Sequence, residues 1–141
     1  MSLSAILLAL ALQGSLDARA RDHNCRDPQN QHDMNACALI DFERADARLN
    51  AVWRETIAGA RAADAELDRR YDERATSEAV LRAAQRAWIA FRDSHCTWQG
   101  YEEARGGSME PMVYNGCRAA LTRARIGELG GDAPEAEPSE R

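Results

Sequence analysis

Residues 77–100 read SEAVLRAAQRAWIAFRDSHCTWQG, and the spacing of the side chains in this stretch decides the fold class. One set of positions alternates in steps of three and four residues, which is the period of one face of an α-helix. These positions are Leu81, Ala84, Trp88, Phe91, His95 and Trp98. Thr76 or Ser77 is a suitable cap for the first turn. The stretch therefore predicts an amphipathic helix that buries this stripe against other helices.

A second stripe with the same period lies upstream, in a helix that we expect to start near Asp33. It consists of Ala38, Phe42, Ala45, Leu49, Val52 and Thr56, widened by Trp53, Ile57 and Ala60. Gly59 weakens this helix by about 1 kcal/mol relative to alanine. Two continuations are therefore open: one unbroken helix through Leu67 and Tyr71, or a short extra helix over residues 64–71. A turn is predicted near residues 72–76.

A third helix is expected after the glycine pair Gly106 and Gly107, which ends the helix before it. Ser108 is the expected cap, and Pro111 is tolerated because it falls in the first turn. The predicted buried face contains Val113, Cys117, Leu121 and Ala124. Three amphipathic helices with short connections predict an all-α fold, a small antiparallel bundle of three main helices.

The first twenty residues have the pattern of an export signal. Residues 3–12 are almost entirely apolar, and Ala18-Arg19-Ala20 is a small-x-small pattern that suits signal peptidase. The apolar run is about half as long as a membrane-spanning helix requires. No lipoprotein signal flanks Cys25. We expect a signal peptide over residues 1–20 and a mature chain, starting near Arg21, that is periplasmic or secreted and has no stable membrane insertion.

The cysteine content agrees with export, because an even number of cysteines in an exported chain predicts disulfide bonds. Three pairings are open for Cys25, Cys37, Cys96 and Cys117. Proximity in the sequence favours Cys25 with Cys37 and Cys96 with Cys117. Each such bond typically adds about 2–4 kcal/mol of stability, so we expect the bundle to be stapled by two disulfides.

Composition limits the domain organisation and the partners. The chain has 141 residues, a net charge of −5, and arginine as its only strongly basic residue type. An acidic chain repels phosphate backbones, so nucleic-acid binding is not expected. Residues 130–141 contain no large apolar side chain and predict a disordered acidic tail. One helical domain is expected over residues 21–129.

A metal site is the sharpest chemical alternative to a purely structural reading of the cysteines. His23, Cys25, His32 and Cys37 are all ligand types that bind zinc. However, structural zinc sites usually contain a close Cys-x-x-Cys or a His pair three to five residues apart, and neither spacing occurs here. Disulfides are therefore favoured, and no metal or cofactor is expected.

Catalytic groups are not indicated either. His95 lies on the predicted apolar stripe, where a partly buried histidine with one hydrogen bond is the simpler reading. Two of the acids Glu102, Glu103 and Glu110 could form a catalytic carboxylate pair like that of a glycoside hydrolase. However, such a pair needs a cleft, which a narrow bundle seldom forms. Trp53, Trp88 and Trp98 have core spacing, which favours packing over sugar stacking. We expect ion pairs at Arg92-Asp93, and a binding protein with no catalytic residue.

The ordered combination of motifs resembles a known family. The motifs are Cys25, Met34-Asn35-Ala36-Cys37-Ala38, Ala45-Asp46, Leu49-Asn50, Ala84-Gln85-Arg86-Ala87-Trp88-Ile89-Ala90-Phe91-Arg92-Asp93, Cys96, Gly107-Ser108 and Cys117. Between Cys25 and Leu129 the chain is similar to the lysozyme inhibitor LprI-like N-terminal domain family. The resemblance implies a small, exported, helical bacterial protein with cysteine staples and, for the founding member, inhibition of lysozyme. Unlike that founder, this chain is expected to have neither a lipobox nor a second domain.

Inhibition of lysozyme requires a protrusion that enters a sugar-binding cleft. The best candidate for this partner-binding loop is Arg105-Gly106-Gly107-Ser108-Met109, because glycines allow close backbone approach and Arg105 can pair with a carboxylate. An ordinary helix stop with a serine cap explains the same residues. The expected partner is lysozyme. A different envelope protein is the alternative, and a hydrolase acting on cell-wall sugars is the third reading.

Overall fold

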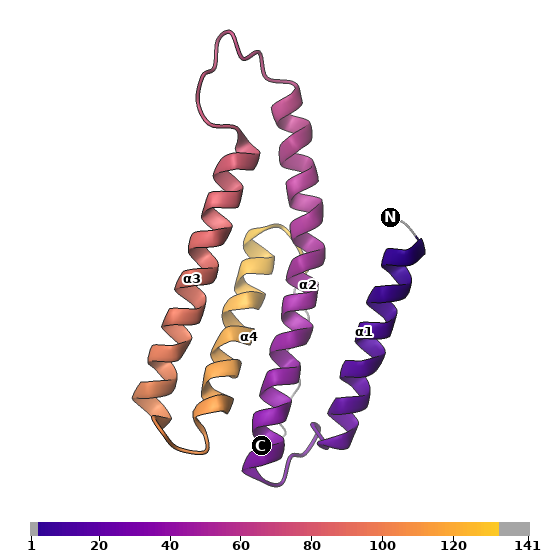
Figure 1. Cartoon of the computed structure of the whole chain (residues 1–141), viewed down its shortest axis with the longest axis vertical. Coiled ribbons are helices and arrows are strands. Elements are labelled where there is room, and N and C mark those ends of the chain that lie inside the picture. Colours follow the sequence, from indigo (N-terminus) through magenta and orange to yellow (C-terminus); the bar gives the residue numbers. More distant parts are fainter. Residues whose placement is uncertain (1–2, 133–141) are drawn as a thin grey trace.

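The computed structural model describes residues 3–132, and this part of the chain folds into four helices without a strand (Figure 1). The helices are α1 (Leu3–Asp22), α2 (Gln31–Ala65), α3 (Ser77–Ala104) and α4 (Glu110–Glu128). Helices α2, α3 and α4 form the predicted antiparallel bundle, in which α4 packs against both α2 and α3. Helix α1 lies beside α2 only. The all-α prediction is confirmed.

Helix α2 is the longest element and carries the centre of the core. Asn30 caps it by accepting the backbone N–H of Asp33 through its side chain, so the helix begins two residues before the predicted start. It continues unbroken past Gly59 and ends at Ala65, and residues 66–76 form a connection instead of a short extra helix. The buried residues are Ile40, Phe42, Ala45, Leu49, Val52 and Ile57, which confirms most of the predicted stripe.

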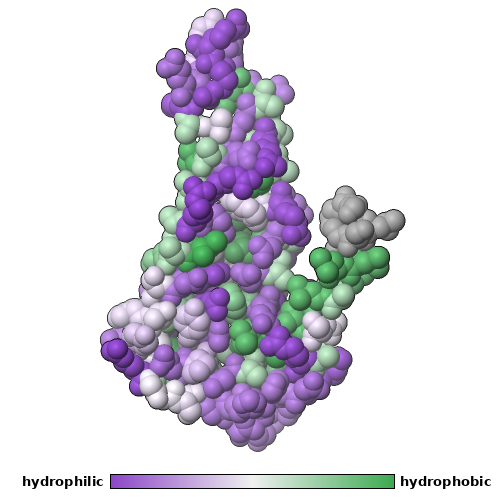
Figure 2. Space-filling model, viewed as in Figure 1, coloured by the Kyte–Doolittle hydropathy of each residue, from purple (hydrophilic) through white to green (hydrophobic). Residues whose placement is uncertain are grey.

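The connection between α2 and α3 is a charged turn that Asp64 closes. The Asp64 carboxylate accepts the backbone N–H groups of Ser77 and Glu78 at 2.7 and 2.8 Å, and Thr76 Oγ1 accepts that of Ala79. The last turn of α2 thus caps the first turn of α3. These hydrogen bonds, first that from Glu78, lower the pKa of Asp64. Figure 2 shows the connection as a hydrophilic tip on the molecule.

The Asp64 cap makes stability depend on pH. Because the pKa of Asp64 is lower in the folded chain than in the unfolded chain, its contribution is present above about pH 4 and is lost as the pH falls through the folded pKa. We expect wild type to melt at a higher temperature than Asp64→Asn at pH 7, and the difference to shrink towards pH 2. Thermal melts of both proteins measure this, and an undiminished difference at low pH would refute the charged cap.

The buried face of α3 differs from the predicted stripe. Trp88 does pack against the cluster of Leu49, Val52 and Ile126. The fully buried positions, however, are Gln85, Arg92, Cys96 and Gly100, whereas Ala84, Phe91 and Trp98 are exposed. The core placement of Phe91 and Trp98 was therefore wrong. The helix is rotated because the cysteine that bonds to α4 and the arginine that pairs with α2 face inwards, and both contribute little to an apolar pattern.

Helix α4 also buries a different face from the predicted one. Its buried residues are Asn115, Ala119, Thr122 and Ile126. The predicted positions Val113, Cys117 and Leu121 are only half-buried, and Ala124 is exposed. Asn115 and Thr122 are polar, so an apolar period does not mark the buried face. Pro111 is in the first turn as predicted.

Both expected disulfide pairings are present. Cys25–Cys37 joins the segment before α2 to the second turn of α2, and Cys96–Cys117 joins α3 to α4. The pairing excludes the zinc set that includes Cys25 and Cys37, because zinc needs thiolate ligands and both sulfur atoms are oxidised.

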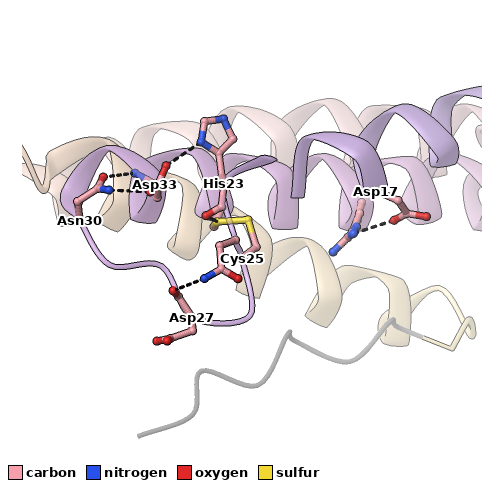
Figure 3. The surroundings of a disulfide bond; sticks show 9 residues. Asp17, His23, Cys25, Asp27, Asn30 and Asp33 are labelled. Atoms are coloured by element: carbon pink, nitrogen blue, oxygen red, sulfur yellow. Dashed lines mark hydrogen bonds and ion pairs between the residues drawn. A yellow bond between two sulfur atoms is a disulfide. The ribbon is translucent and has the colours of Figure 1, made fainter. Parts of the chain in front are cut away.

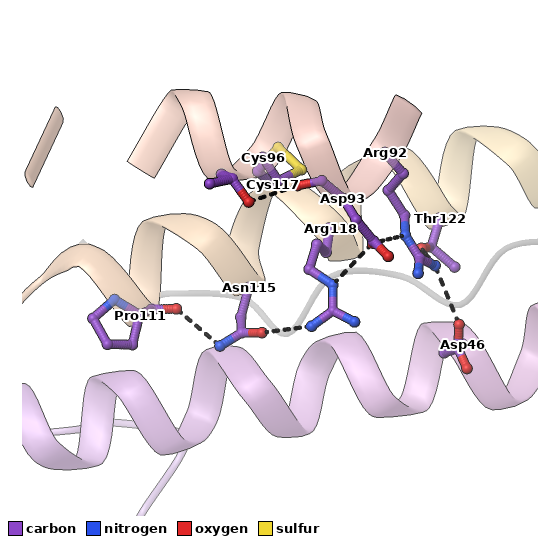
Figure 4. A network of polar contacts seen from close by, with 10 residues as sticks. Asp46, Arg92, Asp93, Cys96, Pro111, Asn115, Cys117, Arg118 and Thr122 are labelled. Carbon is purple, nitrogen blue, oxygen red and sulfur yellow. Dashed lines mark hydrogen bonds and ion pairs between the residues drawn. A yellow bond between two sulfur atoms is a disulfide. The ribbon is translucent and has the colours of Figure 1, made fainter. Parts of the chain in front are cut away.

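Arg92 is the most heavily partnered side chain of the core (Figure 4). Its side chain is 6% exposed and reaches Asp93 at 2.8 Å, Asp46 of α2 at 3.3 Å and Thr122 of α4 at 3.4 Å. Its guanidinium also lies over the rings of Phe42 and Trp88, 5.1 and 5.2 Å from their centroids. The predicted ion pairs at Arg92 and Asp93 are thus present, and together with the hydrogen bond to Thr122 they link all three helices of the bundle.

Helix α1 contains the predicted export signal and is attached to the bundle near its C-terminal end. Leu16 is buried, and Asp17 and Arg19 form ion pairs with Arg44 and Glu43. Nearer its start the helix exposes Ile6, Leu7, Leu8, Leu10 and Leu12, the green edge in Figure 2. Among residues 3–132 no helix is long and apolar enough to cross a bilayer. Cleavage after Ala20, which lies inside α1, stays a prediction.

The end of the described chain folds back on α2. Gly130 adopts a φ of 79°, and the N–H of Gly131 bonds to the carbonyl of Ile126, which closes α4. Arg48 Nε then donates to the carbonyl of Asp132 at 2.9 Å. The tail predicted from residue 130 is therefore ordered as far as Asp132, and its residues 133–141 lie outside the described residues.

Candidate partner-binding face

One face of α3 carries a continuous row of ring-bearing side chains that ends in an arginine. The row, called here the aromatic stripe, consists of Phe91, His95, Trp98, Tyr101 and Arg105, spaced by three or four residues. Phe91 is 55% exposed and Trp98 57%. The helical spacing of these residues predicted a buried face. They are exposed instead, because a different side of α3 packs against the bundle.

Contacts within the aromatic stripe hold its rings in a defined arrangement. The rings of Phe91 and His95 stack with centroids 5.3 Å apart, and the ring of His95 lies 5.7 Å from that of Trp98. The guanidinium of Arg105 lies 4.4 Å from the centroid of Tyr101, which is a cation–π contact. A pre-ordered surface loses less side-chain entropy when a partner binds.

The loop predicted as the partner-binding site follows the aromatic stripe directly. All five of its residues, 105–109, are exposed. Arg105, Gly107, Ser108 and Met109 line a shallow surface pocket together with residues 101–104. Gly106 has a φ of 72°, a conformation that other residues rarely adopt. Its N–H donates to the Glu110 carboxylate at 2.6 Å, and the N–H of Gly107 donates to the carbonyl of Ala104 at 2.8 Å. The two glycine N–H groups are therefore used inside the turn.

The predicted serine cap is wrong, and Ser108 has a different role. Helix α4 begins after Met109, without a hydrogen bond from a capping side chain. The backbone carbonyl of Ser108 instead accepts a hydrogen bond from Asn35 Nδ2 of α2 at 2.9 Å. The Cys96–Cys117 disulfide joins the two flanking helices. The loop is thus tied to all three helices of the bundle.

The rim of this face is acidic. Glu102 and Glu103 are exposed beside the loop, and Glu103 accepts a hydrogen bond from Gln99. Glu110 is engaged in the turn through Gly106. Of the three acids considered for sugar hydrolysis, Glu102 and Glu103 are therefore exposed to solvent, and Glu110 stabilises the turn. The arrangement differs from a paired-carboxylate site, in which one acid is desolvated in a cleft.

Sequence reasoning missed four of the residues that build this face, Phe91, His95, Trp98 and Tyr101. Aromatic side chains at helical spacing have the same pattern whether they face a core or a partner. Arg105 could have indicated that the face is exposed, because it follows Tyr101 by four residues and continues the row of aromatic residues into the glycine loop. The row therefore lies on the same side of the helix as this exposed connection.

The fold and this surface define a disulfide-stapled helical-bundle protein with one exposed aromatic face. Residues 23–129 match the family model described as "Lysozyme inhibitor LprI", so the chain belongs to this family, as the sequence motifs predicted. The chain is also 43% identical over 125 residues to "Uncharacterized protein R02472" of Rhizobium meliloti (strain 1021), which covers 89% of each protein. No solved structure matches the chain.

Proposed function

We propose that this chain is an exported protein-binding module that inhibits a lysozyme through the aromatic stripe and the adjoining loop, without catalysis of its own. The family description names lysozyme inhibition. The observation that carries the location of the site is the exposed aromatic stripe that runs into a rigid loop. Tryptophan, tyrosine and arginine are the residues that most often dominate binding energy at protein interfaces.

The contacts of the loop define how it would meet the cleft of lysozyme. Glycosidases of this kind work with two carboxyl groups in a sugar-binding groove. Because the N–H groups of Gly106 and Gly107 are used within the turn, the donors left for a carboxylate are the Arg105 guanidinium and the Ser108 hydroxyl. The aromatic stripe would cover the walls of the groove. The acidic rim of Glu102 and Glu103 suits a basic partner such as lysozyme.

A lysis assay separates the proposed function from its alternatives. Turbidity loss of a cell-wall suspension with lysozyme is followed as increasing amounts of the purified chain are added. An inhibitor protects the suspension in proportion to its concentration. A module that binds another envelope protein leaves the rate unchanged, and a hydrolase of cell-wall sugars accelerates it. Either of the last two results would contradict lysozyme inhibition.

The loop can be tested through its two exposed polar side chains, Arg105 and Ser108. Arg105→Ala should weaken inhibition by about tenfold. This corresponds to a loss of about 1.4 kcal/mol of binding free energy, a size that is usual for an arginine at a protein interface. Ser108→Ala should weaken inhibition less. Both residues are exposed, so helical content and melting temperature should stay unchanged. Arg70→Ala is the matched control, because Arg70 also lies over a tyrosine, Tyr71, but in the connection that precedes α3, whereas Arg105 follows α3. If Arg105→Ala inhibits like the control, the loop is not part of the site.

The export component of the proposal has its own measurement. The chain expressed with residues 1–20 in a Gram-negative host should be recovered from the periplasm or medium, and its mass should correspond to a start at Arg21 with no free thiol. An unprocessed chain retained in the cytoplasm would contradict export. The bundle does not depend on the leader for its core, because Leu16 is the only fully buried side chain that the described part of α1 contributes.

A further inference from the structure

Two histidines and an aspartate meet where the segment before α2 passes the start of that helix. His23 Nδ1 lies 2.9 Å from Asp33 Oδ1, and the rings of His23 and His32 are 5.5 Å apart. One ligand atom of each of the three residues lies within 4.8 Å of the other two. Imidazole nitrogens and a carboxylate oxygen are the donor set that zinc and related divalent transition metals bind.

The surrounding structure positions each of these donors. His32 and Asp33 are in the first turn of α2, where Asn30 accepts the N–H of Asp33 and donates to Asp33 Oδ2 at 2.7 Å. His23 is two residues from Cys25, whose disulfide to Cys37 ties this segment to the same helix. Figure 3 shows the His23 ring directed at Asp33, with Asn30 on the other side of the carboxylate. Such outer contacts are typical of metal ligands.

The charges at the site favour a cation on balance. Asp33 is the one acidic group among the three donors and supplies a carboxylate oxygen to the ion. The N-terminal end of the α2 dipole opposes a cation, but this effect is weak and screened by solvent. Direct coordination by imidazole and carboxylate donors outweighs it.

We propose that His23, His32 and Asp33 form a binding site for a divalent transition cation of the zinc type, with three protein ligands and one position open to water. Neither cysteine takes part, since Cys25 and Cys37 are bonded to each other. A bound ion would connect His23 to the first turn of α2 and so form a second cross-link beside the Cys25–Cys37 disulfide. It lies outside the aromatic stripe and is independent of the proposed lysozyme binding.

Zinc titration of the full chain by calorimetry tests this site. We expect one zinc ion per chain, and a loss of affinity of at least about tenfold in His32→Ala and in Asp33→Asn. His32 is exposed, so its replacement leaves the fold intact. His95→Ala is the matched control because it removes the third histidine of the chain, on the aromatic stripe, and should bind zinc like wild type.

Cobalt provides an independent readout of the ligand geometry. Co²⁺ added to the wild-type chain should give the intense visible absorption of a four-coordinate ion, and this absorption should be absent in His32→Ala. The proposal is overturned if wild type binds no zinc, or if zinc affinity survives both His32→Ala and Asp33→Asn. Affinity that depends on His23 alone would place the ligands elsewhere in the segment before α2.

Discussion

Replacing Arg92 with alanine should lower the free energy of unfolding by about 2–5 kcal/mol, the usual cost of truncating a large buried side chain to alanine. The substitution removes contacts with three helices at once, since Arg92 bonds to Asp46, Asp93 and Thr122. Thr122 is fully buried and would lose this hydrogen bond. The space vacated between the rings of Phe42 and Trp88 adds a cavity.

Chemical denaturation of the oxidised protein measures this effect. Arg86→Ala is the matched control, because Arg86 is on the same helix but exposed, and it should change stability by no more than about 0.5 kcal/mol. Arg92→Met keeps an unbranched apolar stem and should recover part of the loss, because the stem fills space that alanine leaves between the rings of Phe42 and Trp88. Equal stabilities of Arg92→Ala and Arg86→Ala would show that the network does not hold the bundle together.

The second large effect is on inhibition. Trp98→Ala should weaken inhibition of lysozyme by at least about 30-fold, equivalent to the 2 kcal/mol or more of an interface hot spot. Trp98 is at the middle of the aromatic stripe and more than half exposed. For the same reason its removal should leave the melting temperature nearly unchanged, which separates a binding role from a structural one.

Tyr71→Ala is the control for this substitution. Tyr71 is 86% exposed and lies in the connection between α2 and α3, at the end of the bundle remote from the loop. Its removal deletes an exposed aromatic ring without touching the proposed face, so inhibition should be unaffected. Normal inhibition by Trp98→Ala, or a loss in both variants, would remove the aromatic stripe from the binding site.

Local signals in the sequence accounted for the helices and their connections. The Thr76 cap, the stop at Gly106 and Gly107, and Pro111 in the first turn of α4 all act within a few residues. The disulfide pairing also followed, because each bond closes a short stretch of chain. The stripe of α2 was predictable because this helix touches the other three elements and buries ordinary apolar side chains.

The rotation of α3 and α4 was not predictable from the same pattern. Gln85, Arg92, Asn115 and Thr122 are buried, and an apolar period gives such residues no weight. Their burial depends on partners in other helices, for example Arg125 for Gln85 and Asp46 for Arg92. Once these polar residues face inwards, Phe91 and Trp98 must face outwards. The candidate face therefore depends on tertiary pairing, which spacing along one helix does not reveal.

The proposed metal site was not predictable from the sequence for a related reason. The four ligand types considered together, His23, Cys25, His32 and Cys37, include two cysteines that bond to each other. In the proposed site Asp33 takes the place of the cysteines, since the capped first turn of α2 holds its carboxylate beside His23. A single aspartate ten residues from a histidine carries no signal of its own in the sequence.

Hydroxyl-radical footprinting of the chain, alone and with lysozyme, tests the central claim most directly, because it reports the solvent access of individual side chains. Tryptophan, tyrosine and methionine are readily oxidised, and the chain offers them on both ends of the bundle. Binding through the proposed face predicts that oxidation of Trp98, Tyr101 and Met109 falls when lysozyme is present, while that of Tyr71 stays the same. Protection of Tyr71 with unchanged oxidation of Trp98 and Met109 would contradict the account.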